Sequence, residues 1–218
     1  MPSLKRPRGP RPSRVAPPSI LDAAQEVFSA LGIAGAPIRA IAKRAGCAPA
    51  RIYYHYTSKE ALFIALLDRR LPPVAEALAR LADATDHRGS KQRIWAALEA
   101  FHEHLGDDSG FRSLFRGQII QGSEAIKDRM AQHLRPVIGA MRAILQQGMA
   151  RGELRPDLDP TITAFFIGRM HMEILDLVPS MGSRIAGLPR TEGLATVRQA
   201  WLEFLWRAVA ADPAGEHP

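Results

Sequence analysis

The chain has 218 residues, of which 46% are apolar and 23% charged, and its formal net charge is +7 at pH 7. This length suffices for one large domain or two small ones with a buried core, while a single cysteine excludes an internal disulfide. No stretch of about 18 residues is free of charge, so we expect no transmembrane helix and no membrane partner. The N-terminus has no apolar segment typical of a signal peptide, so a reducing cytoplasm is the expected location.

The excess positive charge lies in the first 60 residues. They contain ten Lys or Arg and three acidic residues, whereas the rest of the chain contains 19 of each sign. A basic segment on an otherwise neutral chain is typical of a protein that binds a polyanion through one part. Residues 1–18 hold five basic residues, six prolines and no acid, which predicts a disordered basic arm. Two interpretations stay open: a solvated tail, or an arm that contacts DNA phosphates or the minor groove.

Residues 37–60 have the pattern of two short helices around a tight turn. Apolar residues recur at helical spacing up to Ala45, and Gly46 is suited to end that helix because glycine adopts a left-handed conformation. Pro49 suits the first turn of a second helix, and Ile52 and Tyr53 are expected to pack inward. Two short helices joined by a glycine turn predict a helix-turn-helix, whose second helix enters the DNA major groove.

This stretch, with the sequence IRAIAKRAGCAPARIYYHYTSKEAL, resembles the DNA-binding core of the TetR family of transcriptional regulators. It departs from the family pattern at Cys47, where Val is usual, at Ala48, where a capping Ser or Thr is usual, and at Tyr56, where Phe is usual. Loss of the side-chain cap at Ala48 costs the recognition helix about 1 kcal/mol. Pro49 is expected to offset part of that cost.

The resemblance implies which side chains meet DNA. Arg51 has the planar fork that binds guanine or a phosphate, Tyr54 and His55 match positions that contact phosphates and sugars, and Lys59 begins the next helix. Arg39 and Lys43 lie one turn apart and are either backbone contacts or solvated charges. The full set of expected DNA-binding residues is Arg39, Lys43, Pro49, Ala50, Arg51, Tyr54, His55 and Lys59.

The rest of the chain has helical periodicity throughout. Pro72 and Pro73 should kink or break the helix that follows the helix-turn-helix. Pro136 should bend the helix Ser123–Ala150, and Asp159 fits an N-cap position. Thr57, with Glu60 three residues later, is predicted to cap the helix that follows the helix-turn-helix. The predicted helices outside the helix-turn-helix include Ser19–Leu31, Val74–Ala84, Lys91–Leu105, Phe111–Ile120, Ser123–Ala150, Thr161–Val178 and Thr191–Ala211.

The predicted fold is therefore all-α. An N-terminal three-helix helix-turn-helix DNA-binding head precedes a C-terminal helical domain, to which the resemblance assigns ligand binding and dimerisation. The expected organisation is a basic arm at 1–18, a DNA-binding domain at 19–66, a ligand-binding and dimerisation domain at 67–211 and a tail at 212–218.

Residues 161–178 are apolar almost all round, which requires a large surface to cover them. The resemblance implies that the last two helices, Thr161–Val178 and Thr191–Ala211, pack against their copies in a homodimer; ordinary intrachain core is the alternative. A two-fold protein of this kind would bind double-stranded DNA at a palindromic operator.

The resemblance also implies a pocket for a small-molecule effector in the C-terminal domain. Aromatic and methionine residues with few charges favour an apolar ligand, although each is also typical of plain core. His102 and His104 stand two residues apart and do not share a helix face, so we expect no metal site. The candidate lining residues are Trp95, Phe101, His102, Phe115, Met141, Phe166, Met170 and His171.

The sequence lacks the nucleophile, phosphate-loop, zinc and dinucleotide motifs of common enzymes, so we expect no enzymatic activity and no cofactor. The leading hypothesis is a sequence-specific transcriptional regulator, a repressor released by a small apolar ligand. The alternative is a similar DNA-binding protein that a protein partner controls instead of a small molecule.

Overall fold

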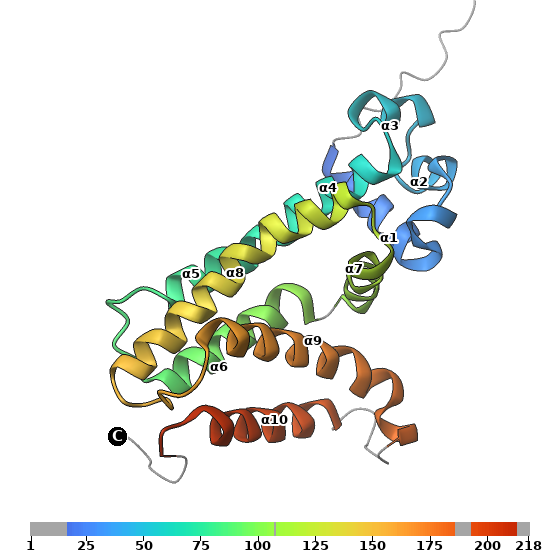
Figure 1. The fold of residues 1–218 in the computed structure, drawn as a ribbon. Helices are drawn as coiled ribbons and strands as arrows, with labels where there is room; N and C mark the ends of the chain where they lie inside the picture. Colours follow the sequence, from blue (N-terminus) through green and yellow to red (C-terminus); the bar gives the residue numbers. More distant parts are fainter. Residues whose placement is uncertain (1–16, 107, 186–192, 213–218) are drawn as a thin grey trace, which may run out of the picture. The chain divides into compact units, whose positions relative to one another are not determined.

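The computed structural model describes residues 17–106, 108–185 and 193–212, and these residues confirm the all-α fold (Figure 1). The chain forms two compact units, Met1–Leu66 and Leu67–Pro218, and α4 crosses the boundary between them. The expected arm and tail fall mostly outside the described residues. The helices are α1 (Pro17–Gly35), α2 (Ile38–Arg44), α3 (Pro49–His55), α4 (Lys59–Arg70), α5 (Pro72–Leu81), α6 (Ser90–Phe101), a π-helical turn (His102–Gly106), α7 (Ser109–Gln121), α8 (Glu124–Ala150), α9 (Pro160–Ile185) and α10 (Gly193–Val209).

The first unit, the head, is built on a small aromatic and aliphatic core. Phe28 of α1 meets Phe63 of α4 edge to face, with ring centroids 6.5 Å apart. Ile41 of α2 and Ile52 of α3 complete this core and are essentially inaccessible to solvent. The helix predicted to end at Leu31 is interrupted as expected at Gly32, where φ is 68°, and one further turn follows up to Gly35, the last residue of α1.

Side-chain caps explain where several helices begin. Asp159 accepts the N–H groups of Thr161 and Ile162, each at 2.8 Å, as its predicted N-cap role requires. The predicted cap of α4 is wrong by one residue. Ser58, not Thr57, accepts the Ala61 N–H at 3.0 Å, because Ser58 is the residue immediately before the helix.

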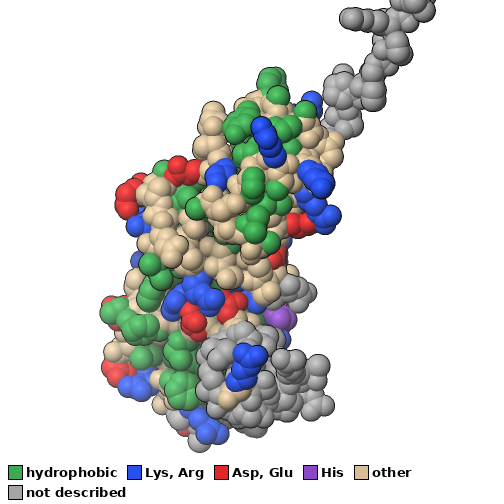
Figure 2. Space-filling view, turned by 90° about the vertical axis from the view of Figure 1, so that its right-hand side faces the viewer, with side chains coloured by type: hydrophobic (Ala, Val, Ile, Leu, Met, Phe, Trp, Pro, Cys, Tyr) green, Lys and Arg blue, Asp and Glu red, His purple; other side chains and the backbone are tan. Residues whose placement is uncertain are grey.

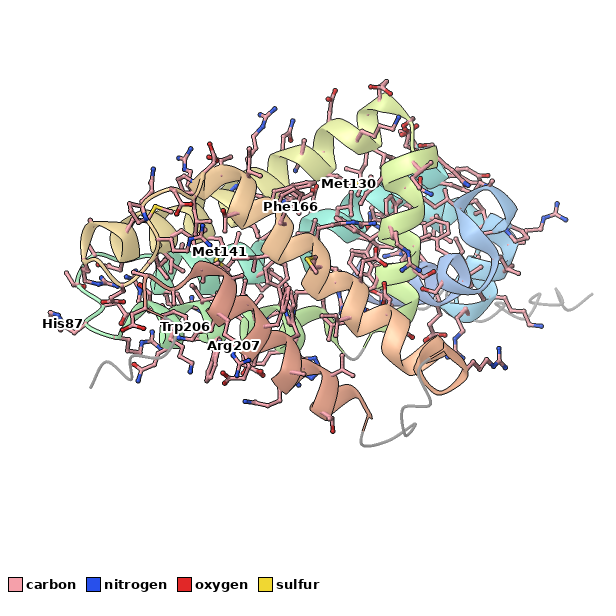
Figure 3. All side chains as sticks on the ribbon, turned by 60° about the horizontal axis from the view of Figure 1, so that its bottom comes forward. His87, Met130, Met141, Phe166, Trp206 and Arg207 are labelled. Atoms are coloured by element: carbon pink, nitrogen blue, oxygen red, sulfur yellow. The ribbon has the colours of Figure 1, made fainter. Side chains whose placement is uncertain are left out.

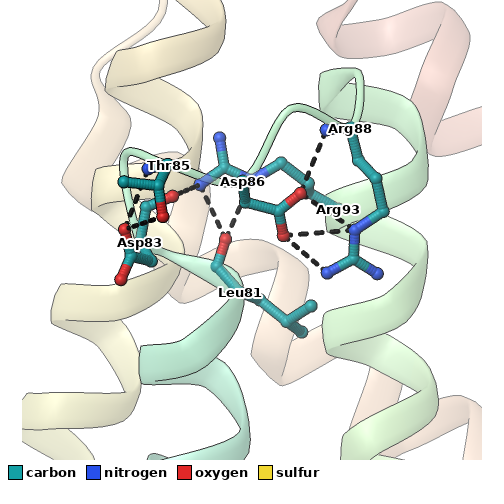
Figure 4. Close-up of polar contacts among 6 residues, drawn as sticks. All are labelled: Leu81, Asp83, Thr85, Asp86, Arg88 and Arg93. Atoms are coloured by element: carbon teal, nitrogen blue, oxygen red, sulfur yellow. Dashed lines mark hydrogen bonds and ion pairs between the residues drawn. The ribbon is translucent and has the colours of Figure 1, made fainter.

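The loop between α5 and α6 is organised by a buried arginine. Arg93 of α6 donates from Nε and Nη2 to the Leu81 carbonyl, at 2.8 and 2.6 Å, and from Nη2 to the Asp83 carbonyl at 3.3 Å (Figure 4). Burial lowers the pKa of Arg93. Because the last carbonyls of a helix have no partner within it, Arg93 satisfies the end of α5 at Leu81, three residues before the predicted end at Ala84.

The second unit, the body, is a helical bundle in which α8 is central. α8 packs against α5, α6 and α9, and α9 packs against α10 (Figure 1). The predicted helix Lys91–Leu105 is divided, since α6 ends at Phe101 and the π-helical turn follows. Within the described ranges, no helix has both the length and the apolar character needed to cross a membrane.

Two glycines of α8 differ in how closely other residues approach them. A Cβ at Gly148 would lie 2.2 Å from Ser90 Oγ and 2.7 Å from Leu154 Cδ1, whereas a Cβ at Gly139 would meet nothing within 4 Å. Gly148 therefore allows the start of α6 and the segment after α8 to contact the helix closely.

We expect Gly148→Ala to lower the free energy of unfolding by about 1–3 kcal/mol, because the methyl group overpacks this contact. Gly139→Ala, the matched control in the same helix, should raise it by up to about 1 kcal/mol through the better helix propensity of alanine. Urea unfolding followed by circular dichroism measures both. Equal effects of the two substitutions would contradict the close approach at Gly148.

Candidate DNA-binding and ligand-binding sites

The turn between α2 and α3 has the geometry that the glycine predicts. Gly46 has a φ of 65°, its N–H donates to the Lys43 carbonyl at 3.3 Å, and the Cys47 N–H donates to the Ala42 carbonyl at 3.0 Å. These two bonds form a Schellman motif, which ends α2 sharply. α3 then begins at Pro49 with Ala48 as an N-cap that makes no side-chain hydrogen bond, as the sequence predicts.

α3 presents most of its side chains to solvent. Ile52 is its one buried residue, Tyr54 is 84% exposed, and Pro49 and Ala50 are also exposed. Arg51 and His55 are half-buried, and the rings of Tyr54 and His55 meet edge-on at 5.1 Å. The helix thus keeps an exposed outer surface, as a helix that enters a DNA groove requires.

A hollow of about 760 Å³ brings three of the expected DNA-binding residues together from three helices. Arg39 comes from α2, Pro49 from α3 and Lys59 from the first position of α4. The Lys59 ammonium donates to the Ala34 carbonyl at 2.6 Å, which holds this charge beside the hollow. The remaining candidates, Lys43, Ala50, Arg51, Tyr54 and His55, do not line it.

The expectation that Tyr53 packs inward is wrong. Tyr53 is 57% exposed and lines the same hollow. In a seven-residue helix, the position taken by Ile52 is the one that faces the core, and the next residue is turned about 100° away from it. The tyrosine hydroxyl is a hydrogen-bond donor, so Tyr53 joins the residues suited to a phosphate.

In the body, a cavity of about 590 Å³ lies between α7, α8 and α9. Its apolar wall includes Phe115 and Ile119 of α7, Leu134, Val137 and Ile138 of α8, and Phe165 and Met172 of α9, with Phe101 of α6 contributing as well. Two of the eight residues expected at a ligand pocket, Phe101 and Phe115, therefore line it.

The other six candidates lie outside this cavity. Met141 of α8 is in the core and Phe166 of α9 is 56% exposed (Figure 3); Met170 is also exposed, at 44%. The Lys91 ammonium lies over Trp95 of α6, 4.7 Å from the centroid of the Trp95 ring. The remaining two, His102 and His171, lie on the π-helical turn and inside α9. Helical periodicity selects apolar residues but not the face that borders a cavity, which explains the misses.

The apolar pattern of the sequence predicts none of the charged residues that line the cavity. Five arginines and two carboxylates line it: Arg112, Arg116, Arg135, Arg142, Arg169, Glu173 and Asp176. One signal for them exists in the sequence, because Arg135 and Arg142 stand seven residues apart and so share a face of α8 with Ile138.

A buried ion pair connects two walls of the cavity. Arg112 of α7 is 3% exposed, and its Nε donates to Asp176 of α9 at 2.7 Å. Its other N–H groups donate to the carbonyls of Leu105 at 2.7 Å and Leu175 at 3.2 Å. Arg116 donates to the second oxygen of Asp176 at 3.0 Å. The carboxylate is therefore shared between two guanidinium groups.

The C-terminal end of α4 is fixed within the body by its own polar contacts. Asp68 accepts from Arg129 Nε at 2.5 Å and lies 2.7 Å from His133 Nε2, both on α8. Partial burial opposes the charge of Asp68, but the hydrogen bonds from these two residues lower its pKa overall. Arg70 also pairs with Asp108, at 3.2 Å.

One face of α9 is apolar and exposed. Ile162, Phe165, Phe166 and Met170 are each between 44% and 56% exposed, and Phe204 of α10 is 62% exposed. On the side of the molecule shown in Figure 2, hydrophobic side chains reach the surface among Lys and Arg side chains. Apolar residues clustered on one helix face are typical of a surface that another protein covers.

Family models match both units of the chain. The model described as bacterial regulatory proteins of the tetR family matches residues 20–66, and the one described as a tetracyclin repressor-like C-terminal domain matches residues 121–183. Among curated proteins, the transcriptional activator FasR of Mycolicibacterium smegmatis is 36% identical over 103 residues, 46% of each chain. The fatty acid metabolism regulator of Bacillus subtilis is 24% identical over 140 residues, 64% of this chain and 71% of the relative.

Solved structures show the same fold. FadR of Bacillus subtilis, in complex with stearoyl-CoA, superposes with a TM-score of 0.71 at 20% identity over 86% of this chain and 96% of the other. A tetR-family regulatory protein from Rhodococcus RHA1 gives a TM-score of 0.73 at 23% identity, over 92% of this chain and 100% of the other.

The helix-turn-helix head on an all-α body defines a DNA-binding transcriptional regulator. Within that class, the two family models and the relatives place the protein plainly: the chain belongs to the TetR family.

For the head, we expect Arg51→Ala to weaken binding to operator DNA by about 1–3 kcal/mol while leaving much of the binding to random DNA, because a base contact carries sequence information. Lys43→Ala should weaken binding to both DNAs alike, as a phosphate contact does. Fluorescence anisotropy with operator and scrambled duplexes measures the difference. A loss of equal size on both duplexes for Arg51→Ala would exclude base reading.

Because His171 of α9 is buried, we expect the stability of the body to depend on pH. His171 is 2% exposed, its ring centroid lies 6.4 Å from that of Phe101, and Glu99, His102 and Arg198 are the charged or titratable groups near it. Burial, and next the charge of Arg198, lower the pKa of His171 to about 4. The unfolded chain has the ordinary histidine pKa of about 6.5, so it binds a proton at a pH where the folded protein does not.

The free energy of unfolding should therefore fall as the pH drops from about 6.5 to about 4, by up to roughly 3 kcal/mol from this residue. His171→Gln should flatten that part of the profile, whereas His87→Gln, at an exposed loop position (Figure 3), should leave it unchanged. Denaturant unfolding across this pH range tests the assignment. An unaltered slope in His171→Gln would show that other groups are responsible.

Proposed function

We propose that the protein is a homodimeric repressor that binds a palindromic operator and is released when a small, largely apolar ligand occupies the cavity between α7, α8 and α9. The observation that carries this proposal is the cavity itself. Its volume of about 590 Å³ lies within the range of pockets that enclose small molecules, and its wall combines aromatic and aliphatic side chains with a few charges.

The relatives support a ligand with a long apolar part. One curated relative is a fatty acid metabolism regulator, and one structure of the same fold is a complex with stearoyl-CoA. Another structure of this fold, SmeT with triclosan, has a TM-score of 0.66 at 21% identity. An acyl chain therefore leads the candidate ligands, and a compact apolar ring system follows.

The contacts of α8 support a route from the cavity to α4. The same stretch of α8 places Leu134 and Val137 in the cavity wall and holds Asp68 of α4 through Arg129 and His133. A ligand that displaces α8 would change the position of the end of α4, which continues into the head. Release requires that the ligand bind more tightly to the state with low operator affinity.

The exposed apolar face of α9 supports a homodimer. Its residues lie in the predicted dimerisation segment Thr161–Val178, and Phe204 lies in the second, Thr191–Ala211. Two copies of this face would bury each other's apolar surface and present two heads to one duplex. In the head, we propose that Arg39, Tyr53 and Lys59 bind phosphates around the hollow while Arg51 reads bases.

The alternative, control by a protein partner, stays open and has one observation in its favour. Ile120 of α7 is 78% exposed and its neighbour Ile119 is 44% exposed, outside the α9 face. A partner that binds there would change operator affinity without a small molecule.

Selection of bound duplexes from a random DNA library tests the proposed function. We expect a palindrome with half-sites about one helical turn apart, or a multiple of that spacing. Titration of that operator complex with acyl thioesters, free fatty acids and triclosan should then dissociate it. A single asymmetric site would contradict the two-fold model, while a palindrome whose complex no ligand dissociates would favour the partner-controlled alternative.

A further inference from the structure

The cavity carries more positive charge than its carboxylates neutralise. Its five arginines face two acids, which leaves an excess of three positive charges around an otherwise apolar wall. An unpaired arginine charge is costly where it is buried in an apolar wall, so such charges are paired or remain exposed to water or a ligand. Which arginines have partners therefore bears on what the cavity binds.

Both acids are committed to arginines of α7 and α9. Asp176 pairs with Arg112 and Arg116, and Glu173 pairs with Arg169 at 2.7 Å and with Arg116 at 3.8 Å. One side of the cavity is therefore a closed network of alternating charges. In that network the carboxylates and guanidinium groups satisfy one another.

The α8 side has a different character. Arg135 and Arg142 are exposed, both line the cavity, and neither has a carboxylate within 4.0 Å among the residues that the structure describes. Seven residues of helix separate them, which corresponds to two turns and about 10 Å along the axis. Two free guanidinium groups thus stand in a row along one edge of the cavity.

The residues between these arginines leave room for a ligand. Ile138 and Gly139 lie between them on the same face, both line the cavity, and a Cβ at Gly139 would meet nothing within 4 Å. Along this face of α8, the Arg135 cation, an apolar surface and the Arg142 cation therefore follow one another. Guanidinium groups bind carboxylates and phosphates through paired N–H donors, and such charge-assisted bonds are stronger than neutral ones.

We propose that Arg135 and Arg142 form an anion-binding subsite, so that the effector is an amphiphile with its apolar chain in the cavity and an anionic head group at the α8 edge. This rests on the proposed function, because it names the ligand class of the same cavity. The shared chemistry is an acyl chain with a carboxylate or phosphate head, which a free fatty acid and an acyl thioester of coenzyme A both supply. The distance between the arginines favours a head with more than one anionic group.

The test measures direct binding of three ligands with the same chain, dodecanoyl-CoA, dodecanoate and dodecanol, to the full-length protein by calorimetry. The variants are Arg135→Gln, Arg142→Gln and the double substitution. The matched control is Arg207→Gln, because Arg207 is an exposed arginine of α10 that lies outside the cavity (Figure 3). Thermal unfolding of each variant without ligand checks that the fold is retained.

We expect an anionic ligand to bind wild type more tightly than dodecanol, and the double variant to lose about tenfold or more of that affinity. Its affinity for dodecanol should be unchanged, as should every affinity of Arg207→Gln. Dodecanoyl-CoA binding best would identify phosphates as the head group, and dodecanoate binding best would identify a carboxylate.

Equal affinity of wild type for dodecanol and both anions would overturn the subsite while leaving an apolar-ligand repressor intact. Equal losses for neutral and anionic ligands in the double variant would also overturn it, because the arginines would then act on the cavity as a whole. Absence of binding by all three ligands would also overturn the anion-binding subsite. The titration of the operator complex with the wider ligand panel would then decide the proposed function separately.

Discussion

The cavity of the body depends on the buried pairing of Arg112 with Asp176. Arg112 is 3% exposed, and partners for its charge and its N–H groups offset the cost of burying it. Asp176 supplies the charge, and the carbonyls of Leu105 and Leu175 take the remaining donors. Because these partners come from the π-helical turn and α9 while Arg112 belongs to α7, one side chain determines how three segments meet around the cavity.

The ion pairs divide the arginines of the cavity wall into two groups. The two acids are already shared among three arginines of α7 and α9, so those arginines maintain the architecture. Arg135 and Arg142 of α8 pair with neither acid. α8 also contributes the close contact at Gly148 and the contact with Asp68, so this helix both borders the cavity and packs against α5, α6, α7 and α9.

In the head, backbone geometry fixes the start of α3, where other helices of this chain have a side-chain cap. The Schellman motif at Gly46 and the fixed φ of Pro49 orient α3, although Ala48 offers it no side-chain cap. The Arg51 N–H donates to the Ala48 carbonyl at 2.9 Å, so the backbone itself closes the first turn of α3.

The sequence by itself determined the helices, the helix-turn-helix and the family. Those features depend on local signals: glycine at a left-handed position, proline at a helix start, an aspartate or serine that caps the next turn, and apolar residues at helical spacing. The errors there are small and local, such as Ser58 capping α4 in place of Thr57, or α5 ending three residues before the predicted Ala84.

Only the tertiary structure decided which residues border the cavity. Phe101 and Phe115 line it while Phe166 and Met170 face outward, although all four fit a helical apolar pattern equally well. The difference arises from how α7, α8 and α9 cross, and that crossing is set by contacts between residues about 60 positions apart, such as Arg112 with Asp176. Periodicity along one helix carries no information about such a partner, so the arginines that distinguish this cavity become visible only when the helices are packed together.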